Sequence, residues 1–402
     1  MRDTKQILLL LNSLAGGGAE TVAIRLSEYL PVANFILLER DVKYQPNKPI
    51  IFLSIYSVKT NPVLKTLFIP FYAYRLSKKI GKDSIIISFL ERANFVNVVS
   101  KLFKKHKAII SVRTNQHTGR IGIKKLNKIL VKILYPGADL IVAVSYGVMQ
   151  SLIELGIEKD KIKVIYNPYP IDEIRELSKE LLNEHEPIFM YPTLITAGRL
   201  TKPKGQWYLL RIFKALKQKH KDLKLVILGE GELKDYLVEL SENLGLKTCV
   251  WDRDRLSSDF DVYFLGFQRN PFKFIARSKL FVFLSLWEGF PNALIEAMAC
   301  GVPVISSDCR SGPREILAPD TDFNYQTQKP EFAQYGILMP VFDVKYKTAK
   351  EPLEEKEMMW VETIEKVLED ENLRKQYSEK AKQRAEDFRI EKIVGEWREV
   401  LK

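Results

Sequence analysis

Two glutamates in one short stretch are the first candidates for chemistry. The stretch Ser285–Ser306, SLWEGFPNALIEAMACGVPVIS, places Glu288 and Glu296 eight residues apart, on either side of a Pro-Asn step. The pattern predicts a loop with Glu288, then a helix that Asn292 caps, with Glu296 near its fourth position, between two buried strands. A carboxylate at that position can accept hydrogen bonds from two neighbouring hydroxyls, as on a ribose. Glu288 is placed to meet a different part of the same ligand.

Two cations form the second candidate. Arg199 and Lys204 lie in LITAGRLTKPKGQWYLL, just after an expected strand and just before an expected helix. An arginine fork and a lysine point charge at such a strand end can neutralise a pyrophosphate. Because pairs of surface cations are common, this motif taken alone does not indicate a binding site. It supports one only in combination with the glutamate pair.

A glycine-rich turn near the N-terminus is the third candidate. SLAGGGAET follows an apolar strand and opens a helix, so the backbone amides of Gly16, Gly17 and Gly18 can face an anion. The turn is not GxGxxG, and it lacks the GK[ST] ending of a P-loop. A plain tight turn is therefore the alternative interpretation.

Short apolar runs alternate with helical patterns along the chain, which is typical of parallel sheets covered by helices on both faces. The expected strands are QILLLLN, NFILLE, IIIS, AIISV, LIVAV and KVIYN in the first half, and LITAGR, LKLVILG, DVYFLGF, KLFVFLS and PVISS in the second. The predicted fold class is α/β, with two tandem doubly wound domains. The C-terminal ends of their strands would face a cleft.

The expected organisation has four parts. Residues 1–170 form the first domain, 171–187 a proline-broken linker, 188–376 the second domain and 377–402 a C-terminal helix. That helix carries Trp397 among several apolar residues, so it must dock on another part of the molecule.

Composition and cysteine content bound the class of protein. With 402 residues, 46% of them hydrophobic and 28% charged, the chain can build two sizeable cores. Three cysteines without a CxxC pair argue against a disulfide framework or a zinc site and favour a reducing cytoplasm. The N-terminal apolar run, Ile7 to Leu11, is too short for a signal peptide and is expected to be a buried strand.

Positive charge is concentrated in one segment. Residues 59–132 hold 17 Lys and Arg against two acids, whereas the whole chain carries a net charge of +12. Such a segment favours a polyanionic partner, either nucleic acid or an anionic membrane surface. Within it, apolar residues are interleaved with cations: Leu64, Leu67, Phe68, Ile69, Phe71, Tyr72 and Tyr74 with Lys65, Arg75, Lys78, Lys79 and Lys82. The competing interpretation assigns the aromatic residues to the core and the lysines to a solvated surface.

A family resemblance joins these motifs. The order GGGAE, GRLTKPKG, LGEGELKDYL, FLGF, EGFPNALIEAMACGVPVISSD and SGPREIL resembles the retaining family-four glycosyltransferases of the GT-B fold, over nearly the whole chain. The E-x7-E element at Glu288 and Glu296 is its most specific part. The resemblance implies two Rossmann-like domains, an acceptor domain and then a nucleotide-sugar domain, with the final helix crossing back to the first.

The resemblance also implies a role for each motif residue. Glu288 would bind the donor sugar and Glu296 the nucleotide ribose, while Arg199 and Lys204 would hold the donor pyrophosphate. The remaining donor-binding positions would be Gly16 and Gly17 in the N-terminal loop, Gly266 and Phe267 beside the base, and Phe290, Pro291 and Asn292 through the backbone.

Two points depart from the family pattern. Many relatives carry a histidine that touches the donor sugar, but here the position in register holds Arg113, with His117 four residues later, and both remain candidates. Asp252-Arg253-Asp254 mimics a DxD metal motif. We expect no metal there, because the motif lies in an apparent polar insertion and does not end an apolar strand, and because the resembling enzymes need no metal for donor binding.

The predicted activity is sugar transfer, with retention, from a nucleotide-sugar donor to an acceptor hydroxyl, without a cofactor. A UDP-sugar is the favoured donor, and a glycan or polyprenyl-diphosphate-linked saccharide the favoured acceptor, because a membrane-binding first domain implies a lipid-linked substrate. The expected location is cytoplasmic and peripheral on the inner face of the plasma membrane. The alternatives are a nucleotide-sugar epimerase or phosphorylase and a nucleic-acid-binding protein, which would leave the two glutamates without a role.

Overall fold

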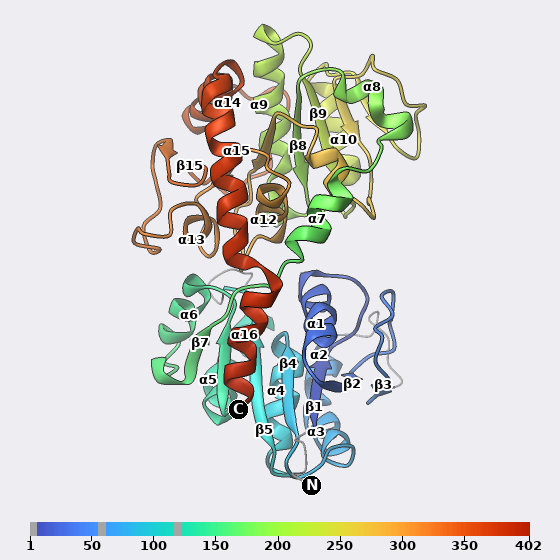
Figure 1. Ribbon diagram of the computed structural model, residues 1–402, viewed down its shortest axis with the longest axis vertical. Helices are drawn as coiled ribbons and strands as arrows, with labels where there is room; N and C mark the ends of the chain where they lie inside the picture. Colours follow the sequence, from blue (N-terminus) through green and yellow to red (C-terminus); the bar gives the residue numbers. More distant parts are fainter. Residues whose placement is uncertain (1–5, 55–61, 116–122) are drawn as a thin grey trace. The chain divides into compact units, whose positions relative to one another are not determined.

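The chain is divided into two compact units in the computed structural model, which describes residues 6–54, 62–115 and 123–402 (Figure 1). The first unit consists of Met1–Pro168 and Ile390–Lys402, and the second of Tyr169–Arg389. The segment 171–187, expected to be a linker, therefore belongs to the second unit. Residues 377–389, expected within the C-terminal helix, belong there as well.

The first unit is built on a parallel sheet of seven strands in the order β3-β2-β1-β4-β5-β6-β7. Its strands are β1 (Ile7–Leu11), β2 (Val32–Leu37), β3 (Ile50–Phe52), β4 (Ile85–Phe89), β5 (Lys107–Val112), β6 (Leu140–Ala143) and β7 (Ile162–Val164). The central strands β1 and β4 are buried along their whole length, as their continuous apolar sequences predict for strands covered on both faces.

Helices cover both faces of this sheet. They are α1 (Gly18–Tyr29), α2 (Pro62–Leu67), α3 (Ile69–Ser77), α4 (Glu91–Ser100), α5 (Ile123–Leu134), α6 (Tyr146–Ile153) and α16 (Ile390–Leu401), with the 3₁₀ turns η1 (Tyr135–Gly137) and η2 (Lys159–Lys161). Helix α4 packs against both α3 and α5. No helix in the described ranges is both long and apolar enough to cross a membrane.

The last helix, α16, completes the core of the first unit. Its residues Ile390, Ile393, Val394 and Trp397 are buried in one cluster with the apolar residues of α1 and the sheet. The rings of Trp397 and Phe89 lie 6.5 Å apart between centroids. The apolar face seen in the sequence therefore docks within the first unit, although the helix begins at Ile390 and not at residue 377.

The second unit has a sheet of eight strands in the order β10-β11-β9-β8-β12-β13-β15-β14. They are β8 (Thr193–Ala197), β9 (Lys224–Leu228), β10 (Thr248–Val250), β11 (Val262–Phe264), β12 (Leu280–Phe283), β13 (Val304–Ser307), β14 (Glu331–Phe332) and β15 (Ile337–Met339). Only the edge pair β14–β15 is antiparallel among these strand pairs of the described chain. The predicted α/β fold class is confirmed.

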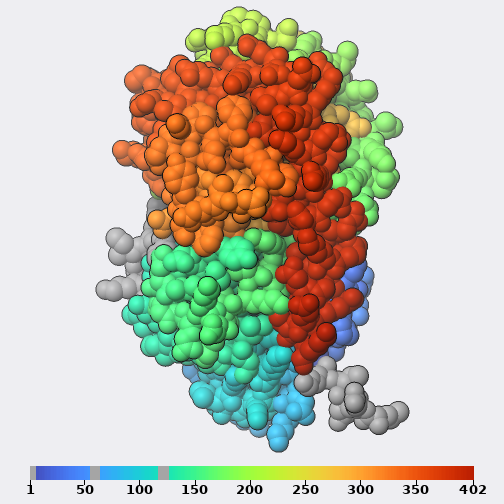
Figure 2. Space-filling view, turned by 60° about the vertical axis from the view of Figure 1, so that its left-hand side comes forward, coloured from blue at the N-terminus to red at the C-terminus, as the bar shows by residue number. Residues whose placement is uncertain are grey.

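The helices of the second unit include a structured entry segment. They are α7 (Ile171–Ser178), α8 (Glu186–Phe189), α9 (Gln206–Lys219), α10 (Lys234–Asn243), α11 (Phe272–Ile275), α12 (Asn292–Ala299), α13 (Pro313–Leu317), α14 (Glu355–Glu369) and α15 (Glu371–Ala385), with η3 (Asn183–His185), η4 (Lys202–Lys204) and η5 (Glu386–Phe388). Helix α7 packs on α11 and α12. The red residues of α14 and α15 lie at the surface of this unit (Figure 2).

One buried arginine holds the irregular segment before α14. The Arg211 guanidinium, on α9, donates to the Glu357 carboxylate at 2.7 and 3.0 Å. It also donates to the carbonyl oxygens of Thr348, Glu351 and Pro352 at 2.5, 3.0 and 2.7 Å. Because a guanidinium can satisfy five acceptors at once, a single side chain fixes a segment without regular structure.

We predict that Trp397→Ala destabilises the first unit by about 3–5 kcal/mol, because it leaves a cavity in the packed core. The measurement is urea unfolding of the full chain followed by circular dichroism. Glu399→Ala, on the exposed side of the same helix, is the control and should change stability by less than about 0.5 kcal/mol. An equal loss in both variants would contradict the docking role of Trp397.

Candidate functional site

Lys204, one of the two predicted cations, and Glu288, the first predicted glutamate, lie at the switch point of the second sheet. Strand β8 pairs with β9 on one side and with β12 on the other, so chain direction through the sheet reverses between β8 and β12. Lys204 follows β8 and Glu288 follows β12. Doubly wound proteins bind ligands at this position, outside the carboxyl ends of the strands.

Lys204 and Glu288 form an ion pair. The Lys204 ammonium donates to Oε1 of Glu288, and the two side chains are 20% and 13% exposed. Ser285 Oγ donates to the same carboxylate oxygen at 2.6 Å. No described residue donates a hydrogen bond to Oε2 of Glu288. One oxygen is therefore anchored, and the other is available to a ligand.

The loop that carries Lys204 is held against the loop that carries Glu288. The amide of Leu286 donates to the Pro203 carbonyl at 2.7 Å. Gly205, with φ of 62°, comes so close that a Cβ there would lie 2.9 Å from the Leu284 carbonyl oxygen. Only glycine fits at this left-handed position so close to another loop. The last glycine of the GRLTKPKG motif therefore fixes the backbone next to Lys204. The Lys204 ammonium also lies 5.1 Å above the centre of the Phe283 ring.

Arg199 is the exposed cation of the same edge. Its backbone carbonyl accepts from the Thr201 amide at 2.9 Å and from the Gln206 side chain at 3.2 Å, which fixes the turn. Its guanidinium forms no ion pair or hydrogen bond with the part of the chain that the structure describes. The planar fork is therefore free to bind an anion.

The helix that holds Glu296 begins one residue earlier than predicted. Helix α12 starts at Asn292 with Pro291 as its N-cap, so the predicted Asn292 cap is wrong and Glu296 is the fifth helical residue. Asn292 Oδ1 instead accepts a hydrogen bond from the Tyr169 hydroxyl at 2.7 Å. The sequence pattern could not identify this competing partner, which lies 123 residues away. The ring of Phe290, beside the cap, is buried.

A buried ion cluster supports the loop behind Pro291. Asp308, which follows β13, accepts from Arg314 at 2.6 Å and from the Thr327 amide at 2.7 Å. Burial raises the pKa of Asp308, although these hydrogen bonds oppose the shift. A Cβ at Gly312 in this loop would lie 2.3 Å from Cδ of Pro291. The loop therefore packs directly on Pro291, the N-cap residue of α12.

Gly266 and Phe267 follow β11 on the same edge of the sheet. The Gly266 carbonyl accepts from the Gly229 amide at 2.8 Å, and the Trp251 ring lies against Gly266. The Phe267 ring is 59% exposed. An exposed aromatic ring beside a strand end can stack on a nucleobase.

The remaining predicted residues lie in the first unit. Gly16 and Gly17 join β1 to α1 at the switch point of the first sheet, between β1 and β4, and the Tyr44 ring lies against Gly16. Arg113 follows β5, where it donates to Ser111 Oγ at 3.1 Å and to Asn167 Oδ1, over the Phe89 ring. His117 lies outside the described residues.

Two serines that the sequence analysis did not select belong to the glutamate network. Ser285 binds Glu288 directly, and Ser307 Oγ donates to the Ser285 carbonyl. Both stand at the carboxyl ends of neighbouring strands, β12 and β13. A serine at the end of an otherwise apolar strand was the sequence feature that could have identified them.

One reason for expecting no metal at residues 252–254 was wrong, because the motif begins two residues after the end of the buried strand β10. Asp252 pairs with Lys234 at 2.5 Å, and Asp254 accepts from the Val250 amide at 2.9 Å. Both carboxylates thus have protein partners. Among the described residues, no group of three or more acidic, histidine or cysteine side chains is arranged to hold a metal ion.

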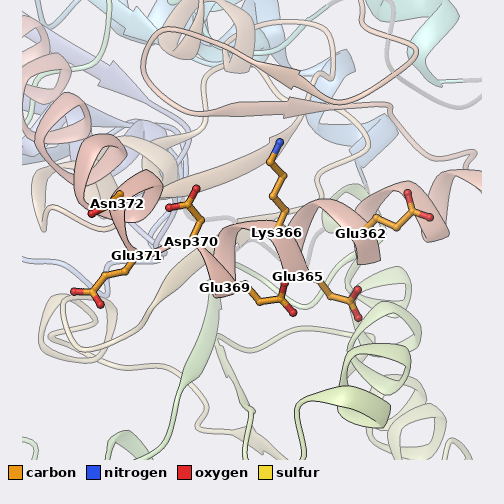
Figure 3. Close-up of a pocket in the computed structure, with 7 residues that line it drawn as sticks. All are labelled: Glu362, Glu365, Lys366, Glu369, Asp370, Glu371 and Asn372. Atoms are coloured by element: carbon orange, nitrogen blue, oxygen red, sulfur yellow. The ribbon is translucent and has the colours of Figure 1, made fainter.

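A hollow at the junction of α14 and α15 is separate from all of these residues (Figure 3). It is lined by Glu362, Glu365, Lys366, Glu369, Asp370, Glu371 and Asn372. Lys366 points away from Glu365 and Glu369 (Figure 3). Asp370 caps α15 through the Leu373 amide at 2.9 Å. The acidic side chains that line the hollow would repel the negative charge of a nucleotide diphosphate.

Comparison with known proteins places the chain in a family. The family model described as Glycosyltransferase Family 4 matches residues 16–173, and the one described as Glycosyl transferases group 1 matches residues 178–328. The chain is 38% identical over 356 residues to an uncharacterized glycosyltransferase of Methanocaldococcus jannaschii, with 84% of each chain covered. The chain therefore belongs to the GT-B glycosyltransferases and is a sugar-transferring enzyme.

Two further comparisons cover almost the whole chain. A Campylobacter jejuni enzyme is 32% identical over 401 residues, with 96% of each chain covered, and is named N-acetylgalactosamine-N,N'-diacetylbacillosaminyl-diphospho-undecaprenol 4-alpha-N-acetylgalactosaminyltransferase. The crystal structure of Anabaena HepE in complex with UDP has a TM-score of 0.74 and 18% identity, covering 98% of this chain and 99% of that one. The second match supports the GT-B fold.

We predict that Glu288→Gln lowers kcat/KM for sugar transfer by more than tenfold, or ~1.4 kcal/mol, because the amide cannot replace the carboxylate beside Lys204. The measurement is initial-rate kinetics, with unfolding monitored in parallel. Glu239→Gln, an exposed carboxylate of α10, is the matched control and should leave both unchanged. Retention of more than a tenth of the wild-type value would overturn the assignment.

Proposed function

We propose that this glycosyltransferase transfers a sugar, with retention of the anomeric configuration, from a nucleotide-sugar donor to a polyprenyl-diphosphate-linked saccharide or related glycan. The observation that carries the proposal is the Lys204–Glu288 pair at the switch point of the second sheet, with one carboxylate oxygen anchored and the other available. The name of the Campylobacter jejuni relative, which includes a diphospho-undecaprenol acceptor, supports the acceptor class. HepE was solved with UDP, so UDP-sugars are the first donors to test.

The pyrophosphate of the donor is assigned to the two cations. Arg199 supplies an unengaged planar fork at the surface, and Lys204 supplies a charge already held at the strand end. The Lys204 ammonium has three donors, so it can bind a diphosphate oxygen while it keeps its bond to the Glu288 carboxylate. In the transition state the leaving diphosphate gains charge, so cations that wait in place lower the barrier.

The two glutamates receive different parts of the donor in this proposal. Oε2 of Glu288 accepts hydrogen bonds from sugar hydroxyls, and the Glu296 carboxylate accepts them from the ribose. The exposed ring of Phe267 stacks on the base beside Gly266, and the backbone from Phe290 to Asn292 contacts the donor.

The first unit contributes the acceptor side of the proposal. We assign the backbone at Gly16 and Gly17 to the donor phosphates and the acceptor, and Arg113 or His117 to the donor sugar. No side chain is assigned as a covalent nucleophile. The leaving phosphate itself accepts the proton of the acceptor hydroxyl on the same face of the sugar, which gives retention.

The proposed location follows from the acceptor. A polyprenyl-linked saccharide stays in a bilayer, so the enzyme that extends it must reach the membrane surface. We therefore place this enzyme in the cytoplasm, peripheral on the inner face of the plasma membrane.

The direct test is transfer by the purified full chain in detergent, with UDP-sugars that include UDP-N-acetylgalactosamine and a diphospho-undecaprenol-linked saccharide. We expect a product lengthened by one sugar whose α-anomeric signal in NMR matches the donor. Activity should survive EDTA, because cations of the protein, and not a metal, meet the diphosphate. Loss of activity with EDTA that Mn²⁺ restores would overturn the metal-free mechanism, and an inverted product would overturn retention.

We predict that Arg199→Ala and Lys204→Ala each weaken UDP binding by about tenfold to a hundredfold, because each removes a charge-assisted hydrogen bond worth about 1.5–3 kcal/mol. The measurement is isothermal titration calorimetry with UDP. Lys247→Ala, an exposed lysine of the same unit, is the control and should bind like the wild type. Unchanged affinity in both test variants would show that the two residues are ordinary surface cations.

A further inference from the structure

The helices α2 and α3 carry an outward apolar stripe. Leu64, Leu67, Phe71 and Tyr74 follow one another at spacings of three, four and three residues, which puts them on one face of a helical path. All four are exposed, Leu67 by 70%. Surface helices normally turn such a stripe toward the core, so its exposure requires a reason.

The opposite side of the same helical path is already apolar and buried. Ile69, Tyr72, Ala73 and Leu76 point into the first unit. The prediction that the whole aromatic segment faces a partner was therefore wrong for Ile69 and Tyr72, which belong to the core. The structure separates a core face from a second apolar face that is exposed.

The stripe continues onto the turn after α4. The rings of Tyr74 and Phe103 meet edge to face, with their centroids 5.7 Å apart. Phe103 is exposed, and Leu102 beside it is 83% exposed. Light-blue and cyan residues, the colours of this part of the chain, lie at the surface of the first unit (Figure 2). We call the set Leu64, Leu67, Phe71, Tyr74, Leu102 and Phe103 the apolar stripe.

Cations border the apolar stripe. The Arg75 guanidinium lies 5.7 Å from the centre of the Phe71 ring, and the Lys78 ammonium lies 5.2 Å from that of Tyr74. Lys79, Lys82 and Lys105 are exposed and form no ion pair within the described part of the chain. Other lysines of the segment are engaged elsewhere: Lys65 pairs with Glu39 and Lys101 with Asp139.

Helix α5 repeats the arrangement on the other side of α4. Leu126, Ile129 and Ile133 are exposed at spacings of three and four residues, with Lys132 exposed between them. Two outward apolar rows with interspersed lysines thus flank one buried helix in the same layer of the first unit.

We infer that the apolar stripe and its bordering cations dock on the interface of an anionic lipid bilayer. A bilayer offers acyl chains for the leucines, the headgroup level for Phe71, Tyr74 and Phe103, and negative charge for the lysines. A second copy of this chain would bring like charge against like charge in a symmetric contact. Nucleic acid would satisfy the cations but would leave Leu67 and Leu102 in water.

This inference rests on the proposed function, because a lipid-linked acceptor gives the surface its use. It adds the face through which the enzyme meets the membrane, and it is tested without donor or acceptor. The apolar stripe contains none of the residues assigned to the donor, so its variants should keep transfer to a detergent-solubilised acceptor.

The experiment is sedimentation of the full chain with vesicles of phosphatidylcholine alone or mixed with phosphatidylglycerol. We expect binding only to the mixed vesicles, and weaker binding as salt rises. Changing Lys78, Lys79 and Lys82 together to Glu should lower the partition coefficient by about a hundredfold or more, since each cation near the surface contributes about fivefold. The matched control changes Lys329, Lys345 and Lys350, exposed lysines of the second unit, to Glu.

The apolar contribution is tested by Leu67→Ser with Phe71→Ser, which should lower binding at least about tenfold. Leu181→Ser with Met190→Ser, two exposed apolar residues of the second unit, is the control and should bind like the wild type. Equal recovery in the supernatant with both kinds of vesicle would overturn the inference. So would stripe variants that still bind, a dimer in ultracentrifugation that the stripe variants abolish, or binding to single-stranded RNA without binding to vesicles.

The transfer assay and the vesicle assay together distinguish a failure of this inference from a failure of the proposed function. Transfer in detergent without vesicle binding would remove the docking surface and leave the proposed activity intact. Vesicle binding without transfer of any tested sugar would support the docking surface and count against the proposed activity.

Discussion

Parallel strand pairing is the constraint on which the candidate site depends. In a parallel sheet all strands end at one edge, so loops that are far apart in sequence meet there. Lys204 and Glu288 are separated by 84 residues, yet they form an ion pair because β8 and β12 are neighbours in the second sheet. The strand order reverses between β8 and β12, and doubly wound proteins bind their ligands at such a reversal.

The loop that carries Lys204 and the carboxylate of Glu288 are held in place by different kinds of contact. Backbone contacts fix the cationic loop, through the close approach of Gly205 to Leu284. Side-chain hydrogen bonds from Ser285 and Lys204 fix the carboxylate of Glu288. Such anchoring keeps both groups in place before a ligand binds, which reduces the reorganisation that the reaction would require.

The first unit combines an ordinary core with an unusual exterior. Helix α16 closes the core with Trp397, while α3 turns Phe71 and Tyr74 to water. An apolar row bordered by cations lowers solubility unless a partner covers it. Membrane docking and the lipid-linked acceptor are therefore two parts of one functional proposal.

The α/β class, most of the strands, and the motifs GRLTKPKG and E-x7-E were predictable from the sequence, because buried parallel strands leave continuous apolar runs and turns require particular residues. Strands β3, β10, β14 and β15 were not predicted, although β7 and β11, which also have three residues each, were. The sequence did not reveal that Asn292 binds Tyr169 and does not cap α12, that Ser285 anchors Glu288, or that Tyr72 is buried while Tyr74 is exposed. These outcomes depend on contacts between distant segments, which a local pattern does not record.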